Sequence, residues 1–476
     1  MLLLPIIIPV IMGIKLLFKD IKNIKLYSIS VTIVTLILSI IMIKYNGYKE
    51  TILELPYNMS IILKIDDISL IFSILFCFIW LIVLLYSLDY MKHDNNSNRF
   101  FSFYLATLGP LIGLSYSNNF VTFYMFFEFV SILSFALVLH DQTDKAINAS
   151  KKYLFYSIGG ALIGLLAIFY FYNIPMTNYE FIEGGHKELL NNNINNILMF
   201  SLLFAIGFGC KAGLFPLQGW LKTAHPIAPA PASAVLSGIT TKAGVIAFIR
   251  LFYYFVPIEL FKGTVYHLIL VTITLLTIFL GSMLAYKEKV IKTRLAYSTV
   301  SQVSYVLLGL LMFNEYAFVG AMLHVVFHAL AKNSLFLAAG VFIHNLHITN
   351  VSDLKGLGNK TKASFISFGI AGLSLVGIPF TAGFISKYYL AMGALENGTI
   401  GLISVSIIMI SALLTAGYLL TIFKDAFFCE KECMDNEEVL VTRNMKASIL
   451  PIMTILLGVF PTSLINIFMD IVHKLM

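Results

Sequence analysis

Charged residues are scarce in this chain of 476 residues: they make up 12% of it, against roughly 25% in soluble domains. Cysteine is scarce too, and of the four cysteines only Cys429 and Cys433 lie close together. Two thiolates cannot hold an iron–sulfur cluster that needs four, and no Cys/His set completes a zinc site. Glycine-rich dinucleotide motifs, P-loops and nucleophile elbows are missing as well. We therefore expect no metal, no cofactor and no catalytic redox centre in this chain.

Apolar residues are abundant, at 59% of the chain with a mean hydropathy of +0.87. Runs of about 20 apolar residues are long enough to cross a bilayer, and lipid-exposed spans of this kind must be helices. The sequence predicts an all-α polytopic membrane protein of about fourteen spans. They are 2–18, 26–43, 68–88, 101–116, 119–139, 153–172, 197–215, 231–255, 266–286, 297–312, 317–344, 365–395, 400–423 and 445–469. The polar stretches between them are too short to bury a core of their own.

Proline interrupts the helix at two of these spans: Pro216 closes the seventh, and Pro379 lies within the twelfth. Unwound helices at bilayer depth line cavities, and they hold the ion site in many transporters with inverted repeats. Because the two interrupted spans lie five apart, we predict two inverted five-helix repeats, spans four to eight and nine to thirteen. The expected organisation is one transmembrane domain over 1–476: spans one to three in 1–100, repeats at 101–255 and 266–423, and the last span at 445–469.

The distribution of basic residues predicts the orientation. Loops after odd-numbered spans hold 21 of the 32 Lys and Arg residues; the other loops and the C-terminus hold 7, with Arg250 counted among them. This bias places the odd-numbered loops in the cytoplasm and both termini outside. We expect a multi-pass protein of a prokaryotic plasma membrane. The net charge of +7 then reflects topology, and no nucleic-acid partner is expected.

Five charged residues remain deep inside predicted spans: Glu128, Lys211, Lys242, Lys332 and Lys387. A charge at the centre of a span costs about 2.5 to 3.5 kcal/mol or more, so such residues usually mark ion or proton pathways. The alternative is that the lysines snorkel to the headgroups, which fits Lys211 best because it lies near a span end. One acid cannot pair with four bases. Either some lysines are neutral part of the time, or a neighbouring subunit supplies acids.

Helical periodicity adds two histidines to this set. His324, His328 and Lys332 recur every four residues in the eleventh span, which places them on one stripe about 12 Å long. Such a row suits stepwise proton transfer. Metal binding by the two histidines and packing through interhelical hydrogen bonds are the alternatives. In the tenth span Ser298, Ser301 and Ser304 either hold water along the route or permit close helix packing.

Four long motifs carry a family resemblance: GFGCKAGLFPLQGWLKTAHPIAPAPASAVLSGITTKAGVIAFIR from Gly207, VIKTRLAYSTVSQVSYVLLG from Val290, HVVFHALAKNSLFLAAG from His324 and GIPFTAGFISK from Gly377. They resemble the antiporter-like subunits of respiratory complex I, Mrp-type cation/proton antiporters and membrane-bound energy-converting hydrogenases. The resemblance implies a coupled Glu128–Lys211 pair, a central Lys242, and further stations at His324, His328, Lys332 and Lys387. It also implies two half-channels joined along the membrane mid-plane.

The predicted function is a proton-translocating membrane subunit of a complex I-like or energy-converting hydrogenase complex. The partners expected from the resemblance are other membrane subunits, including further antiporter-like ones, and peripheral redox subunits. The transported ion is the proton, with Na⁺ as an alternative. Two other functions stay open: a subunit of an Mrp-type Na⁺/H⁺ antiporter without redox chemistry, and a non-conducting structural subunit.

Overall fold

The computed structural model describes residues 1–56, 59–92, 94–429 and 448–476, and it divides into two compact units. The first unit consists of 1–212, 239–270 and 474–476, and the second of 213–238 and 271–473. Cys433 and residues 445–447 of the predicted last span lie outside the described residues.

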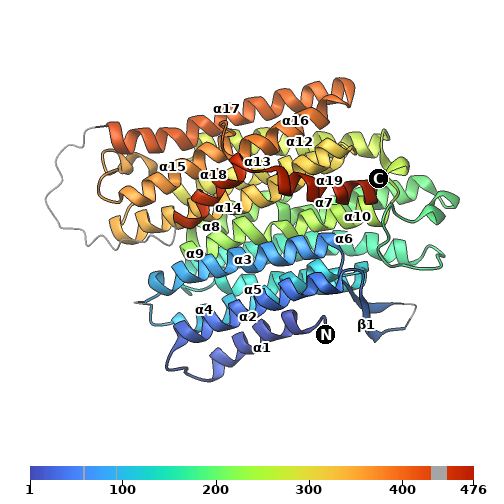
Figure 1. The fold of residues 1–476 in the computed structure, drawn as a ribbon, viewed down its shortest axis with the longest axis horizontal. Coiled ribbons are helices and arrows are strands. Elements are labelled where there is room, and N and C mark those ends of the chain that lie inside the picture. Colours follow the sequence, from blue (N-terminus) through green and yellow to red (C-terminus); the bar gives the residue numbers. More distant parts are fainter. Residues whose placement is uncertain (57–58, 93, 430–447) are drawn as a thin grey trace. The chain divides into compact units, whose positions relative to one another are not determined.

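The first unit is a bundle of helices with one β-hairpin (Figure 1). Its elements are α1 (Leu4–Phe18), α2 (Ile24–Ile41), η1 (Met42–Tyr45), β1 (Lys49–Glu54), β2 (Ser60–Lys64), α3 (Asp67–Tyr90), α4 (Ser97–Tyr116), α5 (Phe120–Val138), α6 (Asp144–Tyr172), η2 (Lys187–Asn191), α7 (Ile194–Ala212), α10 (Lys242–Tyr254) and α11 (Ile258–Phe261).

The second unit consists of helices and the loops between them, as far as its residues are described. Its elements are η3 (Leu217–Trp220), α8 (Leu221–Ile227), α9 (Ala230–Val235), α13 (Ile291–Leu311), α14 (Glu315–Leu346), η5 (Val351–Leu354), α15 (Lys362–Val376), α16 (Ala382–Leu395), α17 (Gly398–Phe428), α18 (Ile449–Val459) and most of α19 (Thr462–Leu475). Two further elements are divided between the units, η4 (Leu236–Thr240) and α12 (Val265–Lys287).

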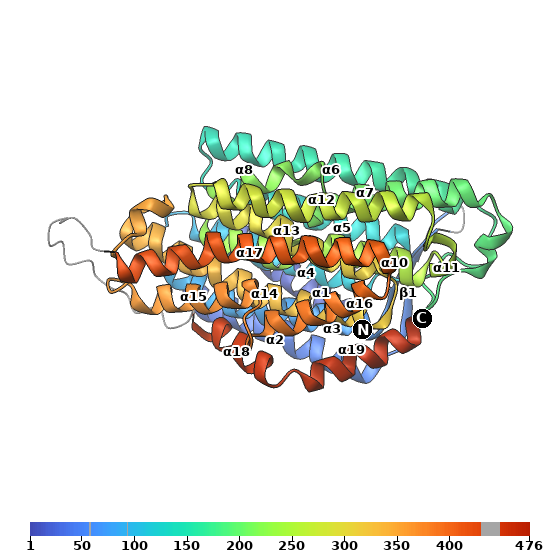
Figure 2. The ribbon, with the colours of Figure 1, turned by 90° about the horizontal axis from the view of Figure 1, so that it is seen from above.

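The prediction of a helical multi-pass membrane protein is confirmed, although the count of fourteen spans is not. Within the described residues, nine helices are long and apolar enough to cross a membrane. A tenth span results if α18 and α19, which meet at a bend of 73°, are counted as one; the bend is visible in Figure 2. Shorter apolar helices such as α1 and α15 account for part of the difference.

The polar stretch after α2 forms the hairpin, which the sequence analysis did not predict. β1 and β2 pair antiparallel, with Lys49 opposite Lys64 and Thr51 opposite Ile62. Buried and exposed side chains alternate only weakly along β2, and a two-stranded hairpin is marginally stable by itself. The hairpin therefore depends on contacts with neighbouring elements. Thr122 in α5 supplies one contact, since its hydroxyl accepts from the amide of Ile62 at 2.9 Å.

Glycines bring α6 and α7 into close contact in the first unit. A Cβ placed on Gly207 would lie 2.5 Å from the backbone nitrogen of Gly164, and one on Gly160 would lie 2.6 Å from the carbonyl oxygen of Gly207. Only glycine permits this approach, in the manner of small-residue interfaces between membrane helices. The side chain of Lys211, one turn beyond Gly207, is thereby brought against α6.

In the second unit, α15 ends at Val376 and α16 begins at Ala382, with Pro379 between them. Gly377 closes α15 in the left-handed conformation, at φ 92°, and its amide bonds back to Leu373. In the first unit α7 ends at Ala212, four residues before Pro216. Both prolines therefore lie outside helices that end just before them.

Candidate functional site: buried charged groups of the two units

Lys211 lies in the last turn of α7 and is fully buried. Its ammonium donates to three hydroxyls, Ser131 Oγ at 3.0 Å, Tyr153 OH at 2.6 Å and Ser157 Oγ at 3.2 Å. It also lies 4.5 Å from the centre of the Tyr153 ring. Hydroxyls and an aromatic face stabilise a cation, and none of these three hydroxyls carries a full negative charge.

Two helices supply these hydroxyls. Tyr153 and Ser157 are four residues apart in α6 and therefore occupy one face, while Ser131 comes from α5. Polar residues at this spacing inside a predicted span were the available sequence signal. Because Tyr and Ser are common in spans for packing alone, this signal does not by itself indicate a site.

Glu128 precedes Ser131 by three residues and so lies on the same side of α5. Its side chain is half-buried, and Lys211 is the cation whose charge acts on it. The buried Oε1 atom accepts no hydrogen bond from the described part of the chain. Glu128 thus lies where the charge of Lys211 acts on it, while Lys211 itself donates to neighbouring hydroxyls.

Lys242 is the first residue of α10, separated from the π-helical turn of η4 by Thr241 alone, and is 1% exposed. Gly244 packs against the end of α7: a Cβ on it would lie 2.7 Å from the nitrogen of Ala212. Because Ala212 follows Lys211, this contact places the start of α10 beside the end of α7. The two predicted lysines of the first unit therefore lie on helices in direct contact.

In the second unit, α14 carries the predicted stripe. His324, His328 and Lys332 are all buried, and the rings of the two histidines lie 6.1 Å apart between centres. His324 Nδ1 is 2.9 Å from Ser386 Oγ, and Lys332 Nζ donates to the carbonyl of Leu295 at 2.9 Å. No group of three potential metal-binding side chains occurs in the described ranges.

Lys387 belongs to α16, and its side chain reaches back to the break between α15 and α16. Its ammonium donates to the carbonyls of Leu375 and Val376, at 2.5 and 2.9 Å. The last carbonyls of a helix have no partner within it and carry the negative end of its dipole. Ending α15 before Pro379 therefore creates the acceptor site that Lys387 fills.

The family model described as "NADH:quinone oxidoreductase/Mrp antiporter, TM" matches residues 117–416, and a second model, for the N-terminus of complex I chain 5, matches residues 54–101. The chain belongs to the NADH:quinone oxidoreductase/Mrp antiporter family. The predicted resemblance is thus confirmed.

Curated relatives from both branches of the family match most of the chain. NADH-quinone oxidoreductase subunit N of Desulforudis audaxviator is 31% identical over 78% of this chain and 74% of its own length. The D-type subunit of the Na⁺/H⁺ antiporter of Alkalihalophilus pseudofirmus is 28% identical over 96% of this chain and 93% of its own.

Solved structures support the same fold. A chain of the Mrp complex from Dietzia sp. DQ12-45-1b superposes with a TM-score of 0.86 at 19% identity, covering 100% of this chain and 97% of that one. A chain of respiratory complex I from Thermus thermophilus gives a TM-score of 0.80 at 21% identity, with both chains covered completely. All of these neighbours belong to membrane assemblies.

Among the residues that the structure describes, four further charged side chains are buried beyond the predicted set: Arg250, Asp66, Lys292 and Arg294. Counting Arg250 with a loop was wrong, because it lies within α10, two turns beyond Lys242, and is 1% exposed. It donates to both carboxylate oxygens of Asp66, at 2.5 and 3.1 Å, and to the carbonyl of Ser115. This buried ion pair joins α10 to the N-terminus of α3.

Asp66 precedes α3 and caps it, accepting from the amide of Ser69 at 2.8 Å. Burial by itself would raise the pKa of Asp66, but the Arg250 guanidinium and the Ser69 hydrogen bonds outweigh it and hold that pKa below its usual value. Asp66 is therefore ionised at neutral pH.

His225 in α8 is a further buried group that the sequence analysis did not single out. It packs against Phe336, with ring centres 5.1 Å apart, and neither ring nitrogen has a partner in the described residues. Lys292 lies near it, donating to the carbonyl of Ala228 at 2.7 Å.

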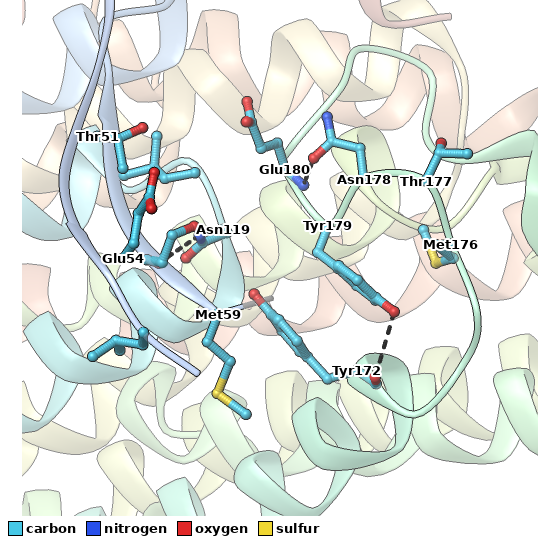
Figure 3. Close-up of a pocket in the computed structure, with 13 residues that line it drawn as sticks. Thr51, Glu54, Met59, Asn119, Tyr172, Met176, Thr177, Asn178, Tyr179 and Glu180 are labelled. Carbon is cyan, nitrogen blue, oxygen red and sulfur yellow. Dashed lines mark hydrogen bonds between the residues drawn. The ribbon is translucent and has the colours of Figure 1, made fainter. Parts of the chain in front are cut away.

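An open cleft of about 570 Å³ lies at the hairpin of the first unit (Figure 3). Glu54 of β1, Asn119, Tyr172 and Glu180 are among its lining residues, and Tyr179 OH donates to the backbone near Tyr172. None of the seven predicted proton-path residues lines it. The charged groups of the predicted site are instead enclosed within the helices.

Proposed function

We propose that this chain is a proton-translocating subunit of a multisubunit membrane complex of the complex I or energy-converting hydrogenase type. In the first unit the proposed stations are Glu128, Lys211 and Lys242; in the second they are His324, His328, Lys332 and Lys387. The proposed setting is a prokaryotic plasma membrane with both termini outside. Further antiporter-like subunits and peripheral redox subunits are the proposed partners.

The observation that carries the proposal is the environment of Lys211. Its ammonium is buried on neutral hydroxyls, while Glu128 lies on the same side of α5 with one carboxylate oxygen unbonded. A small movement of Glu128 changes the charge acting on Lys211. At an effective dielectric near 20, two unit charges 4 Å apart interact by about 4 kcal/mol, which corresponds to a shift of roughly three pKa units.

The proposed cycle begins with Glu128 drawn towards Lys211, which keeps the ammonium protonated. A charge or conformational change in a neighbouring subunit then moves Glu128 away, and Lys211 releases its proton towards Lys242. In the second unit the proton passes by His328 and Lys332 to Lys387. Lysine and histidine suit these steps because both can accept and release protons when buried.

Replacing Glu128 with Gln tests the coupling. The amide keeps the shape of the side chain and removes its charge, so we expect proton translocation by the assembled complex to fall by up to about three orders of magnitude, given the interaction of about 4 kcal/mol. The measurement is acidification of inverted membrane vesicles, with co-purifying subunits as the check on assembly. Glu396→Gln, at an exposed position after α16, is the matched control and should transport normally. Proton translocation by Glu128→Gln at the wild-type rate would contradict the proposed coupling between Glu128 and Lys211.

A second candidate is a subunit of an Mrp-type Na⁺/H⁺ antiporter that works without redox chemistry. The near-complete coverage of the Alkalihalophilus pseudofirmus antiporter relative favours it. Proton transport that requires Na⁺ and no electron donor distinguishes this candidate. A non-conducting structural subunit is the third, and it predicts that substitutions of the buried charged residues leave transport unchanged wherever assembly is preserved.

A further inference from the structure

Buried hydroxyls from α12, α13 and α17 contact one another directly in the second unit. Ser282 Oγ lies 2.7 Å from Ser301 Oγ and 2.5 Å from Ser411 Oγ, and the last two are 3.0 Å apart. Tyr305 OH donates to Ser411 Oγ at 2.6 Å. These four side chains are fully buried. Figure 2 shows the three helices that supply them running alongside one another.

A second cluster of hydroxyl side chains lies one helical turn away from this first cluster. Tyr418 OH donates to Ser298 Oγ at 2.8 Å and is 3.2 Å from Thr415 Oγ1. Ser298 precedes Ser301 by three residues in α13, and Thr415 follows Ser411 by four in α17. The two clusters are therefore neighbours on the same helix faces, because residues at these spacings have Cβ atoms about 5 to 6 Å apart. A gap of about this size is one that a single water molecule can bridge.

The two ends of this row meet charged groups. At one end, the centres of the Tyr305 and His324 rings are 5.6 Å apart, and Lys387 Nζ lies 5.2 Å from the centre of the Tyr305 ring. At the other end Arg294 Nη1 donates to the carbonyl of Tyr418 at 3.0 Å. Arg294 is in the first turn of α13. The row therefore runs from two stations of the proposed path towards the beginning of α13.

A row of hydroxyls can relay protons because each hydroxyl both donates and accepts a hydrogen bond. As an incoming proton forms a new O–H bond on one oxygen, the bond to its former proton breaks and that proton passes to the next oxygen. No net charge stays on any hydroxyl. Rotation of the hydroxyls afterwards resets the row for the next proton.

The electrostatics of the second unit disfavour Na⁺ along this row. Its described Asp and Glu side chains are all exposed or half-buried, whereas Lys332, Lys387, Lys292 and Arg294 are buried. A metal cation among these groups would meet repulsion without a carboxylate to offset it, and the direct hydroxyl contacts within each cluster leave no gap for it. A proton that hops between oxygens needs no such space.

We propose that these seven residues, Ser282, Ser298, Ser301, Tyr305, Ser411, Thr415 and Tyr418, form a hydroxyl row that conducts protons between Tyr305 and the Arg294 end of α13 and excludes Na⁺. This inference rests on the proposed function, since its inner end is defined by His324 and Lys387. The hydroxyl row adds a second proton route, from the charged stations to the beginning of α13, that those stations do not themselves provide.

The alternative is that the serines only permit close packing of α12, α13 and α17. Alanine is as small as serine, so packing alone predicts that Ser411→Ala transports normally. The hydroxyl row predicts a fall of about tenfold for Ser411→Ala and for Tyr305→Phe, because each removes one relay oxygen. Ser404→Ala is the matched control: Ser404 is also buried in α17, but among the described residues its hydroxyl bonds to a backbone carbonyl alone, that of Ile400 at 2.8 Å.

The experiment uses the intact assembly purified through a tag on this chain and reconstituted into vesicles. A valinomycin potassium potential drives proton uptake, read by an enclosed pH dye, and ²²Na⁺ uptake is measured in parallel. We expect slow proton uptake with Ser411→Ala and Tyr305→Phe, wild-type uptake with Ser404→Ala, and ²²Na⁺ uptake that neither Tyr305→Phe nor Ser411→Ala alters. If the assembly does not form with Ser411→Ala, the result with Tyr305→Phe decides between the hydroxyl row and packing, because phenylalanine retains the ring of Tyr305 and removes its hydroxyl.

Wild-type proton uptake by Tyr305→Phe, or ²²Na⁺ uptake that this substitution abolishes, would overturn the inference. Lys242→Met in the same vesicles separates this failure from failure of the proposed function. If Lys242→Met is inactive while Tyr305→Phe is normal, only the hydroxyl row is wrong. If Lys242→Met is itself normal, the proposed function is wrong.

Discussion

Replacing Lys211 with Met should lower proton translocation by at least about two orders of magnitude, because the side chain keeps its approximate volume and loses its only titratable group. Ser131, Tyr153 and Ser157 would then surround a thioether in place of an ammonium. Those hydroxyls are able to bond to one another, so we expect the assembly to survive. The measurement is proton uptake by reconstituted vesicles, with subunit composition checked on a gel.

Lys211→Arg separates the charge from the proton. Arginine keeps the positive charge but does not release its proton at any working pH. A residue that only stabilises the fold through its charge would tolerate this change. A proton station would not, so we expect Lys211→Arg to be as inactive as Lys211→Met. Lys151→Met, at an exposed position of α6, is the control and should transport normally. Normal transport by either Lys211 variant would remove this residue from the path.

Replacing Asp66 with Ala should destabilise the protein by about 3 to 5 kcal/mol, the usual cost of leaving one partner of a buried ion pair uncompensated. The Arg250 guanidinium would keep its bond to the carbonyl of Ser115 and lose both carboxylate bonds. α3 would also lose its cap. Thermal unfolding in detergent measures the effect.

The neighbouring residue is a matched control for Asp66. Asp67 forms its ion pair with Lys474 at 2.7 Å, but the two side chains are 24% and 53% exposed. Exposed pairs contribute about 0 to 1 kcal/mol, so Asp67→Ala should unfold near the wild-type temperature. The double variant Asp66→Leu/Arg250→Met should recover much of the lost stability, because neither charge is then buried alone. A small effect of Asp66→Ala with no recovery in the double variant would contradict this account.

Acidification should reproduce part of the Asp66 effect. The pKa of Asp66 in the folded protein lies below its usual value, because the Arg250 and Ser69 interactions outweigh burial. Its contribution to stability is therefore complete above the unfolded-state pKa, near roughly 3.9, and is lost as the pH falls through the lower folded-state pKa. The stability difference between wild type and Asp66→Ala should narrow in that acidic window and stay constant at neutral pH.

The rarity of charge in apolar spans made the buried lysines predictable. Lys211, Lys242, Lys332 and Lys387 all lie in the interior, where the sequence placed them. Helical spacing likewise placed the two histidines on one stripe with Lys332. These predictions needed only the cost of a charge in lipid and the pitch of a helix.

Partners of the buried charges were not predictable in the same way. Arg250 was counted with a loop because it stands near a span end, and its partner Asp66 lies far away in sequence. The hydroxyls around Lys211 come from two other helices, and the acceptors of Lys387 are backbone carbonyls that any sequence supplies. Such contacts depend on which helix faces meet, and glycine contacts such as that between Gly207 and Gly164 decide this only once the bundle is assembled.

Proton uptake by reconstituted wild-type and Lys242→Met assemblies tests the central claim most directly. Lys242 is 1% exposed at the start of α10, and a methionine in its place is of similar length but cannot hold a proton. Under the same valinomycin potential and with the same co-purifying subunits, we expect the wild type to take up protons and Lys242→Met to show only the leak of empty vesicles. Proton uptake by Lys242→Met at the wild-type rate would contradict the account.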